Sequence, residues 1–210
     1  IEGQPVTLTA EAVTNIAKAF VLYLQEKFNK SELRLSIGRD SRLSGETLLK
    51  AAADGILAMG ADLADFGLAS TPSMFMSTVT KGYEYDGAIM LTASHLPWNR
   101  NGIKFFTKLG GLEKSDIAAI LASAQADAFI HALEHGTLTK VDFLSVYAAG
   151  LVERIRSGVN AEDYDHPLKG FRIVVDAGNG AGGFYVDKVL QPLGADTTGS
   201  QFLEPDGHFP

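Results

Sequence analysis

Residues 86–106 have the sequence DGAIMLTASHLPWNRNGIKFF, in which a short apolar run is followed by chemically active side chains. The run at residues 87–91 is bounded by turn-forming and polar residues, so it predicts a short buried strand. A hydroxyl at Ser94 and an imidazole at His95 follow it, and an ammonium at Lys104 opens the next predicted strand. We therefore expect the chemistry of this chain at the end of a strand.

Ser94 lies next to His95, but this adjacency alone does not predict a serine hydrolase. Neighbouring side chains on an extended segment point to opposite faces and rarely share a hydrogen bond. The surrounding sequence at residues 92–96, TASHL, also lacks the G-x-S-x-G pattern of a nucleophile elbow. A hydrolase stays a rival hypothesis that would require a base within reach of Ser94.

The loop resembles the phosphoserine loop of the α-D-phosphohexomutases, the family of phosphoglucomutase and phosphomannomutase. In that family a T-[AG]-S-H-N-P…N-G-x-K pattern surrounds the serine that carries the transferred phosphoryl group. Leu96 replaces the usual Asn, and eight positions match in order: Thr92, Ala93, Ser94, His95, Pro97, Asn101, Gly102 and Lys104.

Two further motifs agree with the same family in order and spacing. Residues 38–42, GRDSR, resemble its G-R-D-x-R turn, and residues 65–72 resemble its D-x-G-x-x-x-T-P turn. Arg39 and Arg42 could be surface arginines that pair with Asp40 or with nearby acids. Arginine forks at strand ends are also an ordinary means of holding phosphate, and the resemblance favours that role. We expect this turn and Ser94 to share one edge of the sheet, at the carboxyl ends of neighbouring strands.

The hydrophobic pattern predicts alternating strands and helices, and therefore a largely parallel sheet. Thr9 and Ser44 are the predicted N-caps of the first two helices. The pattern predicts helices at residues 10–28, 46–59, 72–80, 113–126 and 141–156, and strands at residues 33–37, 61–66, 87–91 and 103–107. Residues 129–139 give no clear pattern.

Residues 157–170 are polar and irregular, and they predict a domain boundary. We place a first domain at residues 1–160 and part of a second at residues 161–210. Asp163, Asp165 and His166 lie in this segment and could ligate a metal ion. A linker is the preferred interpretation, because close sequence neighbours seldom converge on one ion without ligands from elsewhere.

Residues 171–175 predict a strand that leads into a glycine-rich turn and a helix. Gly178, Gly180 and Gly183 satisfy G-x-G-x-x-G in the context that a dinucleotide site requires. Asp176 opposes that interpretation, because its carboxylate would repel a pyrophosphate.

The same turn also fits the resemblance. The second domain of the phosphohexomutases carries V-D-x-G-N-G-A-G near its start and P-D-G-x-F-P near its end, which residues 175–182 and 205–210 match. The strand, turn and helix also repeat the pattern that begins at residue 33. The resemblance therefore spans nearly the whole chain.

Composition limits the classes of partner. A net charge of −7 over 210 residues, with no run of Lys or Arg, argues against nucleic acid or an anionic membrane as the main partner. The absence of Cys excludes disulfides and thiolate metal sites, and it fits a cytoplasmic location or an organelle stroma. No apolar segment is long enough to cross a bilayer. The chain starts at Ile1 rather than Met and stops in a turn sequence at Pro210, so we interpret both ends as cuts.

The resemblance implies an α/β fold with two similar three-layer domains and mostly parallel mixed sheets, the second incomplete. It implies that a full-length parent interconverts hexose 1-phosphate and hexose 6-phosphate through phosphorylated Ser94 and a hexose 1,6-bisphosphate. Mg²⁺ would bind Ser94 through its phosphate. His95 and Lys104 are the implied proton carriers, although His95 could instead only orient its neighbours. The implied phosphate ligands are Arg39, Arg42 and Asn101.

Several parts of the family pattern do not occur in this chain. They are the D-G-D-x-D-R metal loop, the G-E-x-S-G sugar loop and the R-x-S-G-T-E-P phosphate loop. We therefore expect the chain to need the C-terminal domains of its parent as partners and to be inactive alone, and the preferred hexose is not specified. The alternative is a non-catalytic α/β module that binds a phosphosugar or a dinucleotide.

Overall fold

The computed structural model describes residues 6–209 and divides the chain into two compact units, Ile1–Val141 and Asp142–Pro210. Ile1 and Pro210, on which the interpretation of cut ends rests, lie outside the described residues. The P-D-G-x-F-P match is described up to Phe209 only. Within residues 6–209, no helix combines the length and the apolar character that a membrane span needs.

The described part of the first unit is organised by a six-stranded mixed sheet with the strand order β5-β4-β3-β1-β2-β6. β1 pairs in parallel with β2 and β3, β2 pairs in parallel with β6, and β4 runs antiparallel to β3 and β5. This confirms the predicted α/β class with a mostly parallel sheet. The strands are β1 (Arg34–Arg39), β2 (Asp62–Leu68), β3 (Gly87–Leu91), β4 (Ile103–Thr107), β5 (Gly110–Gly111) and β6 (Leu138–Lys140).

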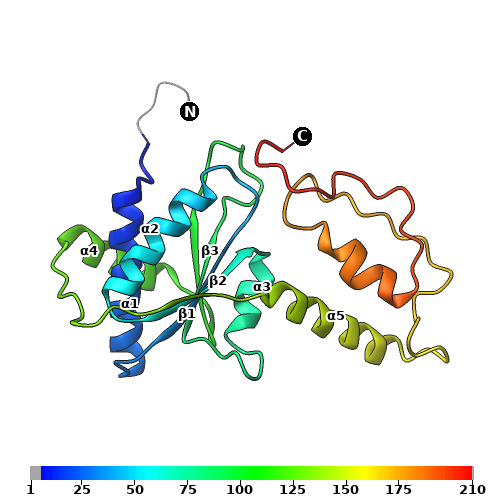
Figure 1. Cartoon of the computed structure of the whole chain (residues 1–210), viewed down its shortest axis with the longest axis horizontal. Helices are drawn as coiled ribbons and strands as arrows, with labels where there is room; N and C mark the ends of the chain where they lie inside the picture. Colours follow the sequence, from blue (N-terminus) through cyan, green and yellow to red (C-terminus); the bar gives the residue numbers. More distant parts are fainter. Residues whose placement is uncertain (1–5, 210) are drawn as a thin grey trace. The chain divides into compact units, whose positions relative to one another are not determined.

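Helices cover both faces of this sheet because side chains alternate along β1. Leu35 and Ile37 point into the core formed with α1 and α2, whereas the Ser36 hydroxyl lies 2.8 Å from the Ser77 hydroxyl of α3 on the other face. Figure 1 shows α1 and α2 side by side along the sheet, with α4 next to α1. The helices are α1 (Ala10–Phe28), α2 (Gly45–Ala58), α3 (Thr71–Ser77) and α4 (Lys114–Ala126).

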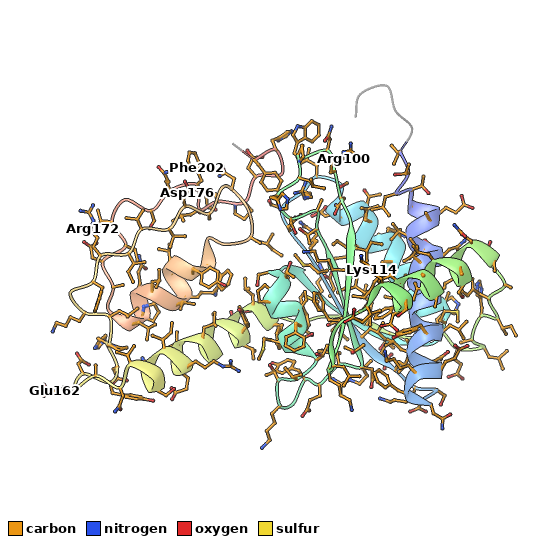
Figure 2. All side chains as sticks on the ribbon, turned by 180° about the vertical axis from the view of Figure 1, so that it is seen from behind. Arg100, Lys114, Glu162, Arg172, Asp176 and Phe202 are labelled. Carbon is orange, nitrogen blue, oxygen red and sulfur yellow. The ribbon has the colours of Figure 1, made fainter. Side chains whose placement is uncertain are left out.

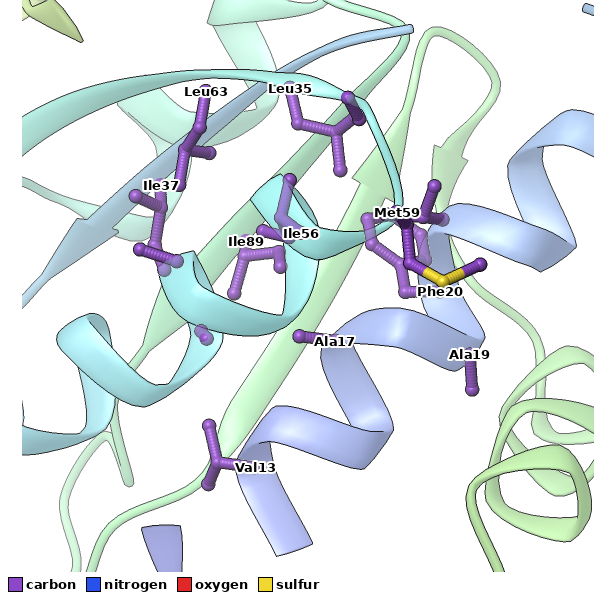
Figure 3. Close-up of a cluster of buried hydrophobic side chains, with 14 of the residues drawn as sticks. Val13, Ala17, Ala19, Phe20, Leu35, Ile37, Ile56, Met59, Leu63 and Ile89 are labelled. Carbon is purple, nitrogen blue, oxygen red and sulfur yellow. The ribbon is translucent and has the colours of Figure 1, made fainter. Parts of the chain in front are cut away.

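The core of the first unit lies between the sheet and the α1/α2 pair, where side chains from both helices converge on the strands (Figure 3). Phe20, Ile56 and Ile89 are each at most 1% exposed. Burying each of these side chains contributes about 1.5–3 kcal/mol. This packing fixes the sheet that carries the loops described below.

The second unit is built around α5 (Phe143–Val159), which packs against a helical segment that contains η1 (Val186–Leu190), a π-helical turn, and η2 (Gln191–Leu193). Ala148 of α5 joins Phe184, Val189 and Leu193 in a separate buried cluster. We predicted α5 as part of the first domain, with the boundary at residue 160, but the compact units divide at residue 142 instead. Helical periodicity showed that α5 has an apolar face, but not which partner that face contacts.

The strand predicted at residues 171–175 is reduced to two isolated bridges, Arg172 to Asp196 and Asp176 to Gln201. Figure 2 shows Arg172, Asp176 and Phe202 on the extended segments of this unit. Phe171 and Val174 remain 59% and 55% exposed. A strand needs paired neighbours to form a ladder, and among residues 142–209 the predicted strand has only these two bridges.

Gly55 tests the contact between α1 and α2. A Cβ at this position would lie 2.4 Å from the Thr14 carbonyl oxygen, so we expect Gly55→Ala to destabilise the first unit by about 1–3 kcal/mol despite its better helix propensity. Gly150→Ala is the matched control, because a Cβ there meets nothing within 4 Å, and we expect α5 to gain up to about 1 kcal/mol. Native-state hydrogen exchange measures the protection of the α2 amides and of the α5 amides separately. Equal gains in protection at both sites would contradict this account.

Asp62 gives a pH-dependent test of the edge strand β6. One of its carboxylate oxygens accepts hydrogen bonds from the Thr137 hydroxyl at 2.7 Å and from the Thr137 backbone N–H at 2.8 Å, and these bonds lower the pKa of Asp62 below its ordinary 3.8. Because the folded pKa is the lower one, the stabilisation is present above pH 3.8 and is lost as the pH falls through the folded pKa. We expect the Thr137 amide to lose exchange protection in that window, with no such step in Asp62→Asn. A step of equal size in both proteins would reject this role of the carboxylate.

Candidate functional site

The turns that follow β1 and β3 leave the sheet side by side. Arg39 pairs in register with Leu91, and the Asp40 backbone N–H donates to the Leu91 carbonyl oxygen at 3.1 Å. Parallel neighbouring strands end at the same edge of a sheet, so both turns project from it together. This confirms the prediction that the turn at residues 38–42 and Ser94 share one edge.

Ser94 lies on the exposed loop between β3 and β4, and its hydroxyl accepts a hydrogen bond from the Lys104 Nζ at 2.8 Å. Lys104 is placed by β4, in which it pairs with Met90 of β3. Ser94 has a backbone φ of +53°, a left-handed conformation that is uncommon for residues other than glycine. The structure therefore brings Ser94 and Lys104 together in a specific and unusual geometry.

The backbone of Ser94 is fixed on both sides. Its N–H donates to the Thr92 Oγ1 at 2.9 Å, and its carbonyl oxygen accepts from the Arg42 Nη2 at 2.8 Å. The Thr92 hydroxyl in turn donates to the buried Asp40 carboxylate at 2.6 Å. Both anchors of Ser94 therefore lead to the turn that follows β1.

Arg42 has a role that differs from the predicted contact with substrate phosphate. Its guanidinium is fully buried, and its five N–H donors are all used, because one donates to Asp40 at 3.0 Å and four donate to backbone carbonyls. Those carbonyls belong to Ser94, Leu96, Pro97 and Arg100, at 2.6–2.8 Å. Arg42 therefore binds the loop itself, and the motif G-R-D-x-R gave no indication that its second arginine is buried.

Arg39 lies at the edge of the site with its side chain 20% exposed. Its guanidinium donates to Glu46 at 2.7 Å and to the Asp40 carbonyl oxygen at 3.2 Å. The side chain passes over Gly45 at the start of α2, where a Cβ would come within 2.8 Å of the Arg39 Cδ. The sequence left open that both arginines pair with nearby acids, and both do. Arg39 pairs with Glu46 at the surface, and Arg42 pairs with Asp40 in the interior.

Asn101 connects the loop to α2. Its side-chain amide donates to the Ser44 hydroxyl at 2.9 Å, and its oxygen accepts from the Gly102 backbone N–H at 2.9 Å. We predicted Ser44 as a side-chain cap of α2; it occupies the N-cap position but makes no capping hydrogen bond. The Ser44 hydroxyl is used by Asn101 instead.

His95 is exposed beside Ser94, and no hydrogen bond or ion pair joins its side chain to another described residue. The only described side chain that hydrogen-bonds the Ser94 hydroxyl is Lys104, an ammonium rather than an imidazole. A hydrolase of the Ser-His-Asp type needs an imidazole within reach of the serine hydroxyl, so the geometry disfavours that form of the hydrolase hypothesis.

The glycine-rich turn of the second unit is closed by its own side chains. Asp176 accepts from the Gly178 backbone N–H at 3.0 Å and from the Gln201 amide at 3.0 Å, and a Cβ on Gly183 would lie 2.2 Å from the Leu203 carbonyl oxygen. Close packing against Leu203 therefore accounts for the glycine at position 183, with no need for a bound nucleotide. The Asp176 carboxylate lies in the turn, where it would repel a pyrophosphate. Both features weigh against the dinucleotide hypothesis.

The polar residues of the predicted linker form separate pairs. Asp163 lies 3.2 Å from the ring of His166, and Asp165 lies 3.7 Å from Arg156. In residues 6–209, no three or more His, Cys, Asp or Glu side chains gather closely enough to hold a metal ion.

Comparison with known proteins identifies the family. Residues 2–131 match the model of "Phosphoglucomutase/phosphomannomutase, alpha/beta/alpha domain I". A phosphoglucomutase/phosphomannomutase of Thermococcus kodakarensis is 35% identical over 206 residues, which are 97% of this chain and 43% of that protein. A phosphoglucomutase of Neisseria gonorrhoeae is 32% identical over 97% of this chain and 41% of its own length. A phosphoglucosamine mutase of Caldicellulosiruptor saccharolyticus is 32% identical, with 95% and 43% covered. The chain therefore spans less than half the length of these relatives.

A solved structure agrees with the sequence matches. The crystal structure of a phosphoglucomutase/phosphomannomutase family protein from Burkholderia thailandensis superimposes with a TM-score of 0.78 at 28% identity, over 100% of this chain and 43% of that one. A structure described as a putative phosphomannomutase from Thermus thermophilus, at 20% identity and a TM-score of 0.72, shows the same fold. More than half of the chain matches the family model, so it belongs to the phosphoglucomutase/phosphomannomutase family.

Proposed function

We propose that this chain is the N-terminal part of a phosphohexomutase in which Ser94 carries the transferred phosphoryl group. The observation that carries the proposal is the 2.8 Å hydrogen bond from Lys104 to the Ser94 hydroxyl, on an exposed loop at the carboxyl end of β3. The substrate class is a hexose monophosphate, since the relatives are named for glucose, mannose and glucosamine phosphates.

The proposed reaction has two balanced transfers. In the first, a sugar hydroxyl attacks phosphorylated Ser94, so that the Oγ–P bond breaks, a new O–P bond forms on the sugar, and a hexose 1,6-bisphosphate results. In the second, the other phosphoryl group of the bisphosphate returns to the Ser94 Oγ, and the isomeric monophosphate leaves. Such transfers depend mainly on positioning and on charge stabilisation.

Lys104 is the proposed partner of the Ser94 oxygen. As the P–O bond breaks, negative charge develops on the Oγ, and an ammonium at hydrogen-bonding distance stabilises that charge. Lys104 is also a candidate for shuttling the proton: the ammonium would give a proton to the departing Oγ, and the resulting neutral amine would take the proton of the sugar hydroxyl. The exposed His95 is the competing candidate. Both side chains lie on the same loop and strand edge as Ser94.

Arg39 and Asn101 are the proposed contacts for the substrate phosphate. The partner of Arg39 is the exposed Glu46, so a phosphate could replace that carboxylate at little cost. Asn101 would have to give up the Ser44 hydroxyl, which is itself exposed. Arg42 is not included, because its donors are fully used in the interior.

Mg²⁺ is the cofactor that we propose for the longer protein, where it would neutralise charge on the transferred phosphoryl group. The residues of this chain do not form a site for it on their own, since no cluster of three ligand-type side chains exists among residues 6–209. The chain's contribution would be the phosphate on Ser94. The remaining domains of the parent are the proposed partners, and the proposed location is the cytoplasm or an organelle stroma.

Ser94→Ala tests the role of the carrier. In a longer protein that contains this chain, we expect turnover of glucose 1-phosphate to fall by at least about 1,000-fold, because the covalent step itself is removed. Ser115→Ala is the matched control, since Ser115 is an exposed serine on α4, and it should retain wild-type turnover. Mass spectrometry of the wild type should locate phosphate on Ser94. Near-normal turnover in Ser94→Ala would reject Ser94 as the carrier.

The isolated chain provides a second test. We expect the 210 residues to fold and yet to show no mutase turnover, because the positioning that the other domains supply can be worth about 7–11 kcal/mol. The assay is coupled conversion of glucose 1-phosphate at high protein concentration, with the 1,6-bisphosphate and Mg²⁺ supplied. Turnover that Ser94→Ala abolishes would show that residues 1–210 suffice, and this account of the other domains would be wrong.

A further inference from the structure

Asp40, Arg42 and Thr92 form one buried hydrogen-bonded group, here called the loop clamp. Asp40 accepts from the Arg42 backbone N–H at 3.1 Å and from the Arg42 Nε at 3.0 Å, and it accepts from the Thr92 hydroxyl at 2.6 Å. The three residues are 8%, 1% and 5% exposed. The carboxylate therefore connects the arginine to the threonine beneath an exposed loop.

The clamp grips Ser94 at both of its backbone polar groups. Thr92 accepts from the Ser94 N–H, and Arg42 donates to the Ser94 carbonyl oxygen. A left-handed conformation at a residue with a side chain costs about 1–3 kcal/mol and persists only where the surroundings enforce it. Residues 94–100 are all exposed and belong to no strand, so sheet pairing does not enforce it. The clamp supplies the constraint.

Arg42 also binds other residues of the loop. Its donors also bind the carbonyls of Leu96, Pro97 and Arg100, so four carbonyl dipoles point toward the buried guanidinium. Those partial negative charges are therefore paired with a buried cation, on the same loop whose Ser94 hydroxyl would carry about two negative charges if it held a phosphate. Only arginine offers five donors in a fixed plane, whereas lysine has three.

Stability alone does not account for the clamp. A buried ion pair often contributes little net free energy of folding, because desolvation offsets the attraction between the charges. What the pair does provide is a unique arrangement of the loop. From this geometry we propose that Asp40, Arg42 and Thr92 act as positioning residues, Asp40 through Thr92 and Arg42 directly on the Ser94 carbonyl, and that they hold Ser94 in the left-handed conformation that presents its hydroxyl to Lys104. The inference rests on the proposed role of Ser94 as the phosphoryl carrier.

Thr92 offers the cleanest test, because Thr92→Val keeps the shape of the side chain and removes the hydroxyl, while Thr92→Ser keeps the hydroxyl. In the 210-residue chain we expect Thr92→Val to speed exchange of the Ser94 amide by about tenfold, as loss of one hydrogen bond would do. In the longer enzyme we expect kcat to fall by about 100-fold with KM nearly unchanged, because the carrier is misplaced while substrate contacts persist. Thr92→Ser should restore both values, and the melting temperature is measured for each variant.

Arg42→Lys is a second, independent variant, with Arg34→Lys at the opposite end of β1 as the control. We expect Arg42→Lys to lower kcat at least as much as Thr92→Val, and Arg34→Lys to leave it unchanged. Wild-type kcat in both Thr92→Val and Arg42→Lys would overturn the inference, as would an unchanged Ser94 amide exchange rate in Thr92→Val. A loss of kcat that only tracks a lowered melting temperature would also overturn it. A wild-type enzyme with neither turnover nor phosphate on Ser94 would instead reject the proposed function, so the two failures are distinguishable.

Discussion

Parallel pairing of β1 with β3 sets Arg39 opposite Leu91, so two turns that are about fifty residues apart in the chain leave the sheet together. Every contact of the candidate site follows from that register. Asp40 can reach Thr92, and Arg42 can reach the loop carbonyls, only because the strands end level with each other. β4 then returns antiparallel to β3 and places Lys104 beside the Ser94 hydroxyl. The register is itself held by the apolar side chains that β1 and β3 direct toward α1 and α2.

The strands on either side of the loop could be predicted to the residue. Residues 87–91 are an apolar run between turn-forming residues, and residues 103–107 follow the Asn101-Gly102 turn and precede a glycine-rich turn. They became β3 and β4 with those bounds. β6 could not be predicted, because all three of its residues are exposed and it joins the sheet only at the edge of β2. An edge strand of this kind is defined by its hydrogen bonds to β2, and its sequence carries no alternation of apolar and polar residues.

The site was predictable in its membership but not in its roles. The motifs brought Ser94, Lys104, Arg39, Arg42 and Asn101 to one edge, as the structure has them. The G-R-D-x-R motif gives both arginines the same expected role. In the structure Arg42 is buried under the loop, whereas Arg39 lies at the surface. The difference arises because Arg42 follows the strand end by three residues and turns inward beneath carbonyls that come from a distant segment. No local sequence pattern contains that information.

The charges around Ser94 identify the group that can respond to a phosphate. The chain carries a net charge of −7, so an anion here must be held by local cations. Arg42 is balanced by the buried Asp40, and Arg39 is balanced by Glu46, which is 80% exposed in its side chain. Lys104 has no carboxylate partner among the described residues, and its ammonium is hydrogen-bonded to a neutral hydroxyl. A phosphate on Ser94 would therefore meet Lys104 without breaking an ion pair and Arg39 at the small cost of a surface pair, whereas recruiting Arg42 would leave Asp40 buried and uncompensated.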